Sequence, residues 1–171
     1  EEGGLFIMAQ ADELNSQEQE EDTLKEKYLI FSVGNEMYGM EMRYITEIIG
    51  MQPITEVPEM PEYVKGVTIL RGKIIPVMDA RLRFNKEVRA YDDRTCIIVL
   101  NTNNSSIGLI VDSVSEVLTM RDEDIAPPPE MYKGRHKYIR GIGKADGSVK
   151  LLLDCQRLLT DDETEELSAL A

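Results

Sequence analysis

Residues 63–84, YVKGVTILRGKIIPVMDARLRF, return in altered form 75 residues later as residues 138–159, YIRGIGKADGSVKLLLDCQRLL. With no gap, a tyrosine, two glycines and an aspartate coincide in the two segments: Tyr63, Gly66, Gly72 and Asp79 with Tyr138, Gly141, Gly147 and Asp154. Two upstream matches keep the same order, residues 38–49 with 107–118 and residues 58–60 with 129–131. Three ordered matches at slowly changing spacing predict an internal duplication of roughly 70 residues.

Within this repeat, β-branched and aromatic runs alternate with glycine-containing or polar turns. The pattern predicts four hairpins: 28–33 with 37–42, 66–70 with 73–78, 96–100 with 107–111, and 138–144 with 148–153. Short stretches with helical spacing follow at 44–49, 79–84 and 154–159, and Asp79 and Asp154 stand at N-cap positions. We therefore expect a mainly β fold with short helices. Its repeat units, 28–84 and 95–159, would be small barrels or sandwiches on a shared core.

The net charge of −13 belongs to the two ends of the chain. Residues 1–26 hold nine acids and one base, residues 161–171 hold five acids and no base, and the remainder is balanced. We expect a flexible acidic tail at 1–23, one domain at 24–160 and an acidic C-terminal tail at 161–171. Residues 1–7 precede Met8 and are interpreted as a cloning remnant.

Composition also limits the partners and the location. An acidic chain with a neutral body is a poor match for nucleic acid or for an anionic membrane surface. No apolar run reaches the length of a membrane helix, and no secretory signal is evident, so a cytoplasmic protein is expected. Cys96 and Cys155 lie inside apolar strings, and two buried free thiols are favoured over a disulfide.

Candidate catalytic and metal-binding groups are sparse. The single histidine, His136, lies in a basic polar run and is interpreted as a solvated loop residue. The acids at 122–124 lack the spacing of a calcium loop, and no Cys-x-x-Cys or histidine cluster suggests zinc. The glycines at 141–147 fit a hairpin turn better than a phosphate loop. We therefore expect no enzyme, no metal and no cofactor.

Binding to other proteins is the remaining possibility. Ile45, Ile48 and Ile49 are spaced as on one face of a helix, next to Glu47. Val114, Val117 and Leu118 occupy the equivalent positions in the second repeat. These residues are either core or part of an apolar strip that accepts a partner helix. Arg71 lies in a turn, where it is either simply solvated or able to bind a carboxylate at the rim of an interface.

These motifs together resemble the bacterial chemotaxis coupling proteins, the CheW-like family. The resemblance covers roughly residues 24–160 and rests on GVTILRGKIIPVMDAR at 66–81, FSVGNEMYGMEM at 31–42 and IGLIVDSVSEVL at 107–118. It implies two five-stranded SH3-like barrels on a common hydrophobic core, without catalytic activity. It also implies two partners, the regulatory domain of the chemotaxis histidine kinase and the cytoplasmic helical tip of chemoreceptors.

By the same resemblance, a groove between the barrels takes the receptor helix. Its residues would be Ile45, Glu47, Arg71, Ile74, Val114 and Val117. Kinase-binding residues cannot be assigned in this way. Ile69 departs from the asparagine that the family usually has two residues before the arginine. Two alternatives stay open: a coupling module of another two-component pathway, or a small β-barrel enzyme.

Overall fold

The computed structural model describes residues 24–102, 105–128 and 138–158. The expected tails at 1–23 and 161–171, and His136, lie outside this part of the chain. No helix within the described residues is long and apolar enough to cross a membrane.

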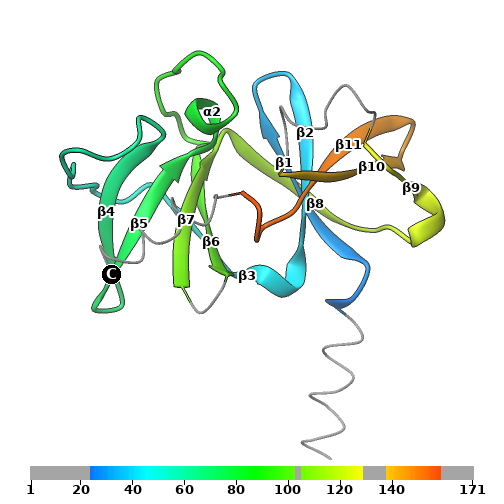
Figure 1. Cartoon of the computed structure of the whole chain (residues 1–171), viewed down its shortest axis with the longest axis horizontal. Coiled ribbons are helices and arrows are strands. Elements are labelled where there is room, and N and C mark those ends of the chain that lie inside the picture. Colours follow the sequence, from blue (N-terminus) through cyan, green and yellow to red (C-terminus); the bar gives the residue numbers. More distant parts are fainter. Residues whose placement is uncertain (1–23, 103–104, 129–137, 159–171) are drawn as a thin grey trace, which may run out of the picture.

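The four predicted hairpins are present, and the described residues add two further strands of six and seven residues together with shorter elements (Figure 1). The first half of the chain contains β1 (Lys27–Val33), β2 (Glu36–Glu41), η1 (Met42–Tyr44), β3 (Ile45–Gly50), β4 (Val64–Leu70), β5 (Lys73–Asp79) and α2 (Ala80–Arg83). The second half contains β6 (Cys96–Thr102), β7 (Ser105–Val111), β8 (Ser113–Thr119), η2 (Asp122–Asp124), β9 (Ile125–Ala126), β10 (Ile139–Ala145) and β11 (Ser148–Leu153).

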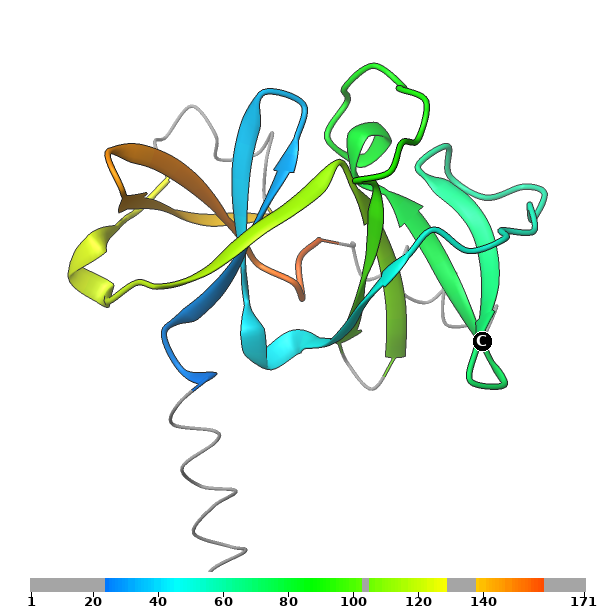
Figure 2. The same cartoon turned by 180° about the vertical axis from the view of Figure 1, so that it is seen from behind.

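The strands form two sheets that curl into adjacent SH3-like barrels (Figure 2). One sheet has five strands in the order β3-β6-β7-β5-β4, as expected. The other has the order β8-β1-β2-β11-β10-β9 and gains a sixth strand, the two-residue β9. The mainly β fold with two small barrels is thereby confirmed.

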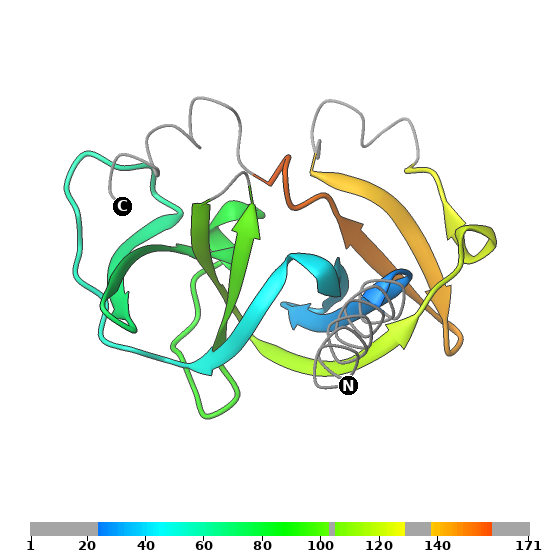
Figure 3. The ribbon, with the colours of Figure 1, turned by 90° about the horizontal axis from the view of Figure 1, so that it is seen from below.

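The barrels do not coincide with the two repeat units of the sequence. The hairpin β1–β2 of the first unit joins the sheet of β8–β11, whereas the hairpin β6–β7 of the second unit joins the sheet of β3–β5. Each exchanged hairpin pairs on both sides, antiparallel with one neighbour (β1 with β8, β6 with β3) and parallel with the other (β2 with β11, β7 with β5). The two halves of the chain have therefore exchanged their first hairpins, and Figure 3 shows the barrels side by side.

The repeat extends to the register of the strands. Both β4 and β10 contain a register shift at the same place, between Val64 and Gly66 and between Ile139 and Gly141. The isolated bridge of Thr55 to Val67 in one barrel matches the pairing of β9 with β10 in the other. The same approximate geometry is thus built twice.

The main core cluster draws residues from both sheets. Leu29, Phe31 and Met40 come from the six-stranded sheet, and Met78 and Leu109 come from the five-stranded sheet, all at 2% exposure or less. A stack of aromatic rings continues through this core, with centroid distances of 5.8, 4.8 and 5.1 Å along Phe31, Tyr38, Phe84 and Tyr138. The predicted shared core therefore holds the two barrels in a fixed relation.

Two of the three expected helices are wrong. Residues 44–49 form the end of η1 and then β3, because the run of β-branched residues extends and pairs with β6. The residues after Asp154 form a turn, in which the Asp154 carboxylate accepts from the Gln156 N–H at 3.0 Å. The helix after Asp79 is confirmed as α2, and Asp79 accepts from the Arg81 N–H at 2.8 Å.

Asp112, the single residue between β7 and β8, connects the barrels. Its carboxylate accepts from Arg81 Nε and Nη2 at 2.8 and 2.7 Å and from the Gly34 N–H at 2.7 Å. Its own N–H donates to the Ser32 carbonyl at 3.0 Å. Burial alone would raise the pKa of Asp112, but the hydrogen bonds from Arg81 and Gly34 outweigh burial and lower it.

We predict that Asp112 makes the stability of the protein fall in acid. An aspartate whose pKa is lower in the folded state stabilises the fold above its unfolded pKa of about 3.9. That contribution disappears as the pH falls through the lower folded pKa. Urea unfolding should show Asp112→Asn about 2 kcal/mol less stable at pH 7, with the gap narrowing below about pH 4. A gap independent of pH would contradict this origin.

We also predict that Gly66 cannot be replaced without loss of stability. Gly66 has φ +146°, and a Cβ there would overlap the Thr55 carbonyl oxygen, which accepts from the Val67 N–H. Gly66→Ala should lower the free energy of unfolding by about 3 kcal/mol. Gly50→Ala is the control, since a Cβ on Gly50 meets nothing within 4 Å. Equal effects of the two substitutions in urea unfolding would disprove the steric explanation.

Candidate functional site

Arg71 and Gly72 form the two-residue turn between β4 and β5. Both have positive φ, 53° and 80°, which is the signature of a type I′ hairpin turn. The twist of this turn matches that of the strands, so β4 and β5 stay paired up to Leu70 and Lys73, the residues that flank the turn. The turn leaves the Arg71 side chain 79% exposed at the end of the hairpin.

Arg71 forms an ion pair with Glu47 on β3. Arg71 Nη2 lies 2.9 Å from Glu47 Oε2, and the Glu47 side chain is 20% exposed. The hairpin β4–β5 and the strand β3 stand at opposite ends of the strand order of the sheet. The ion pair therefore links the two ends of the curled sheet and orients the guanidinium next to β3.

Exposed apolar side chains lie on the same two elements. Ile69 and Ile74 face each other across the β4–β5 hairpin and are 70% and 49% exposed. Ile48 on β3 is 43% exposed. Large aliphatic side chains that remain in water near a charge pair are typical of a surface that another protein covers. Ile69 was not among the predicted site residues, although its departure from the family pattern was visible in the sequence.

The predicted receptor-binding residues are divided between the two barrels. Glu47, Arg71 and Ile74 belong to the five-stranded sheet. Ile45, at the start of β3, and Val114 on β8 are partly buried and contact the shared core cluster. Val117, also on β8, is 48% exposed in the six-stranded sheet.

The prediction that Ile45, Ile48 and Ile49 share one face of a helix is wrong, because exposure alternates along the strand β3. Ile45 and Ile49 are half-buried, whereas Ile48 is exposed, because adjacent residues of a strand point to opposite faces. Ile48 and its repeat counterpart Val117 are thus surface residues, while Ile45 and Val114 are mainly packing residues. The strip is not one continuous apolar face.

The repeat provides a comparison surface on the other barrel. Val117 and Val149 are the counterparts of Ile48 and Ile74, and they are similarly exposed at 48% and 53%. The charges differ, since Glu116 and Asp146 stand where the first barrel has Glu47 and Arg71. Among these equivalent positions, the cation belongs to the five-stranded barrel alone. Its surface can therefore bind a carboxylate at a place where the other barrel repels one.

The described residues contain no group of three or more His, Cys, Asp and Glu that could hold a metal ion. Cys96 and Cys155 are free, as expected. Burial raises the pKa of both thiols, that of Cys155 to about 12, so both are protonated at neutral pH. Neither cysteine has the properties of a nucleophile.

Comparisons with known proteins agree on one family. The CheW-like domain profile matches residues 27–163. The chemotaxis protein CheW of Klebsiella aerogenes is 37% identical over 143 residues, which cover 83% of this chain and 86% of that protein. The probable chemotaxis protein CheW of Rhizobium etli is 32% identical over 138 residues, covering 80% and 89% of the two chains.

A solved structure has the same architecture. The scaffolding protein TtCheW from Thermoanaerobacter tengcongensis superposes with a TM-score of 0.75 at 33% sequence identity. The match covers 81% of this chain and 94% of that protein. The two-barrel arrangement is therefore shared with a relative of moderate identity.

We predict that the Glu47–Arg71 ion pair contributes little to stability. Arg71 is mostly in water, and exposed ion pairs are worth about 0.5 kcal/mol. Glu47→Gln and Arg71→Gln should each change the free energy of unfolding in urea by less than about 1 kcal/mol. Phe31→Ala, in the shared core, should cost about 4 kcal/mol. A loss above about 2 kcal/mol for Glu47→Gln would make the pair a structural element instead.

Proposed function

The chain belongs to the CheW-like family, and from this premise we propose that it couples chemoreceptor cytoplasmic tips to the chemotaxis histidine kinase. It is a chemotaxis adaptor, because the relatives from Klebsiella aerogenes and Rhizobium etli are chemotaxis proteins and a structural relative is a scaffolding protein. We place it in the cytoplasm with these two partners. Signal would pass through it by a shift in the binding equilibrium of the partners, without catalytic turnover.

The observation that supports receptor binding most directly is the Glu47–Arg71 pair among exposed isoleucines. An amphipathic receptor helix would cover Ile69 and Ile74, which lie opposite each other near the turn that carries Arg71, with its apolar face. A carboxylate on the rim of that helix would bind Arg71, whose guanidinium is already oriented by Glu47. The apolar contacts supply affinity, and the charge sets the position of the helix.

The division of the predicted residues suggests how far the receptor contact extends. Glu47, Arg71 and Ile74 are on the five-stranded barrel, and Val117 is exposed on the six-stranded barrel. We propose that the first three form the centre of the receptor contact and that Val117 lies at its periphery. Ile45 and Val114 would support the contact from below through their packing against the shared core.

We predict that Arg71→Glu weakens receptor binding at least about tenfold, because it removes one charge-assisted contact and introduces repulsion. Binding of a receptor cytoplasmic fragment and of the kinase regulatory domain should be measured separately by calorimetry. Kinase binding should not change.

Arg121→Glu is the matched control. Arg121 is also a surface arginine near an acid, 72% exposed and 3.6 Å from Glu123, but it lies in the other barrel. Normal receptor binding by Arg71→Glu would show that the site is wrongly placed. Failure of the unaltered protein to bind either partner would refute the adaptor function itself.

A further inference from the structure

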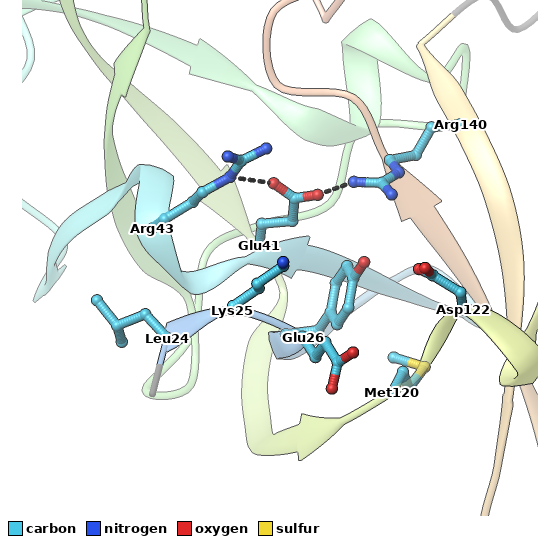
Figure 4. Close-up of a pocket in the computed structure, with 9 residues that line it drawn as sticks. Leu24, Lys25, Glu26, Glu41, Arg43, Met120, Asp122 and Arg140 are labelled. Atoms are coloured by element: carbon cyan, nitrogen blue, oxygen red, sulfur yellow. Dashed lines mark hydrogen bonds and ion pairs between the residues drawn. The ribbon is translucent and has the colours of Figure 1, made fainter. Parts of the chain in front are cut away.

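A cavity of about 730 Å³ opens at one end of the six-stranded barrel (Figure 4). Its walls are formed by the start of β1 and the residues before it, the end of β2, η1, the segment between β8 and η2, the start of η2 and the start of β10. The lining residues are Leu24, Lys25, Glu26, Tyr28, Glu41, Arg43, Met120, Asp122 and Arg140. The volume lies within the usual range of ligand-binding pockets. None of the residues assigned to receptor binding lines it.

One wall is an Arg–Glu–Arg cluster. Glu41 lies between two arginines, with Arg43 Nε 2.6 Å from its Oε2 and Arg140 Nη1 in contact with its Oε1. The Glu41 side chain is only 13% exposed, whereas those of Arg43 and Arg140 are 62% and 35% exposed. Two guanidiniums on one carboxylate leave a positive charge and more N–H donors than the carboxylate can accept. This wall is suited to a second carboxylate.

A β-bulge directs Arg140 to this position. The register of β10 against β11 shifts between Ile139 and Gly141, so that Arg140 is the extra residue. Bulges commonly redirect a side chain away from the regular alternation of a strand. The Arg43 guanidinium lies over the Tyr44 ring, 4.8 Å from its centroid. Both guanidiniums are thus oriented by the fold before any ligand arrives.

The other wall carries the opposite charge. Glu26 and Asp122 line the cavity, and both act electrostatically on the Tyr28 hydroxyl together with Arg140 and Arg43. Burial is the main cause of the raised pKa of Tyr28, while the two arginines lower it and the two acids raise it. With Lys25, the lining has three cations and three anions. A ligand that carries both charges fits this cavity better than a simple anion.

The second barrel shows that the fold does not require these charges. The directly opposed pair Tyr28 and Glu41 corresponds to the opposed pair Ile97 and Ile110 in the five-stranded barrel. These isoleucines are 1% and 2% exposed and belong to an apolar cluster. The same barrel end can therefore be closed by hydrophobic residues, which is often as stable as a buried ion cluster or more so. Stability of the fold therefore does not explain the charged residues at this end of the six-stranded barrel, and a binding function does.

We propose that this cavity binds a polypeptide segment of a partner protein that carries an acidic and a basic side chain close together. The acidic side chain binds Arg43 and Arg140, and the basic side chain binds Glu26 and Asp122. The aliphatic part of the segment contacts Leu24 and Met120. The cavity is large for a single amino acid, and its place on the six-stranded barrel leaves the Glu47–Arg71 surface free for another partner.

The proposal can be tested on the full chain by NMR, with ¹⁵N-labelled protein and blocked pentapeptides. The mixed probe is acetyl-Ala-Glu-Leu-Lys-Ala-amide, and the comparison probes replace Lys by Glu or Glu by Lys. The mixed peptide should shift the backbone resonances of Glu26, Glu41 and Arg140 at millimolar concentration. Each like-charged peptide should need at least about tenfold more.

Matched variants locate the effect. Arg140→Gln should lower the affinity of the protein for the mixed peptide about tenfold. Lys144→Gln, the same charge change at an exposed position of the same strand, should leave the binding unchanged. If Arg140→Gln alters the fold, Arg43→Gln provides an independent measurement of the same loss of affinity.

Four results would overturn the proposal. The first is no shift of the cavity resonances by the mixed peptide, and the second is equal binding of all three peptides. The third is a shift by free glutamate with free lysine as strong as that by the peptide, which would indicate a small-molecule site. The fourth is a shift of the cavity resonances and tighter peptide binding on deletion of residues 1–23, which would identify the chain's own segment as the occupant.

Discussion

Each barrel is completed by a hairpin from the opposite half of the chain, which pairs antiparallel on one side (β1 with β8, β6 with β3) and parallel on the other (β2 with β11, β7 with β5). Because of this exchange, neither half can close its sheet alone, and the main core must contain side chains from both. The carboxylate of Asp112 ties the same junction together, since it binds Arg81 from one unit and Gly34 from the exchanged hairpin. The two barrels therefore behave as one body, and surfaces on both keep a fixed relation.

On this repeated framework, the candidate binding surfaces lie where the two copies differ. Arg71 has Asp146 as its counterpart at the same position of an identical turn, and Glu41 has the buried Ile110. In both cases the backbone is duplicated and the chemistry is not. The five-stranded barrel provides a cation at a hairpin tip, and the six-stranded barrel provides a charged cavity at one end. A duplicated scaffold can in this way present two different sites to two different partners.

The strands were predictable because hairpins are encoded locally, by alternating apolar residues around turn residues such as Arg71-Gly72 and Asp146-Gly147. The helical reading of 44–49 was wrong because spacing in so short an apolar run fits a strand equally well, and pairing with β6 decides. For the candidate site, the resemblance to a family predicted Arg71 and Glu47 as receptor-binding residues. Their 2.9 Å contact, and the exposure of Ile69, were not accessible from spacing.

The sequence by itself determined the hairpins, their turns, the duplication and the balanced charge of the body, since each depends on neighbouring residues or on counting. Only the tertiary structure decided which hairpin completes which sheet. Two similar repeats offer similar edges, so a local pattern cannot distinguish a unit's own hairpin from its copy. The Glu47–Arg71 pair and the contact of Glu41 with Arg140 follow from the same long-range choice. Glu41 and Arg140 lie on β2 and β10, far apart in the chain, and Glu47 and Arg71 belong to opposite ends of the strand order, so both contacts depend on how each barrel closes.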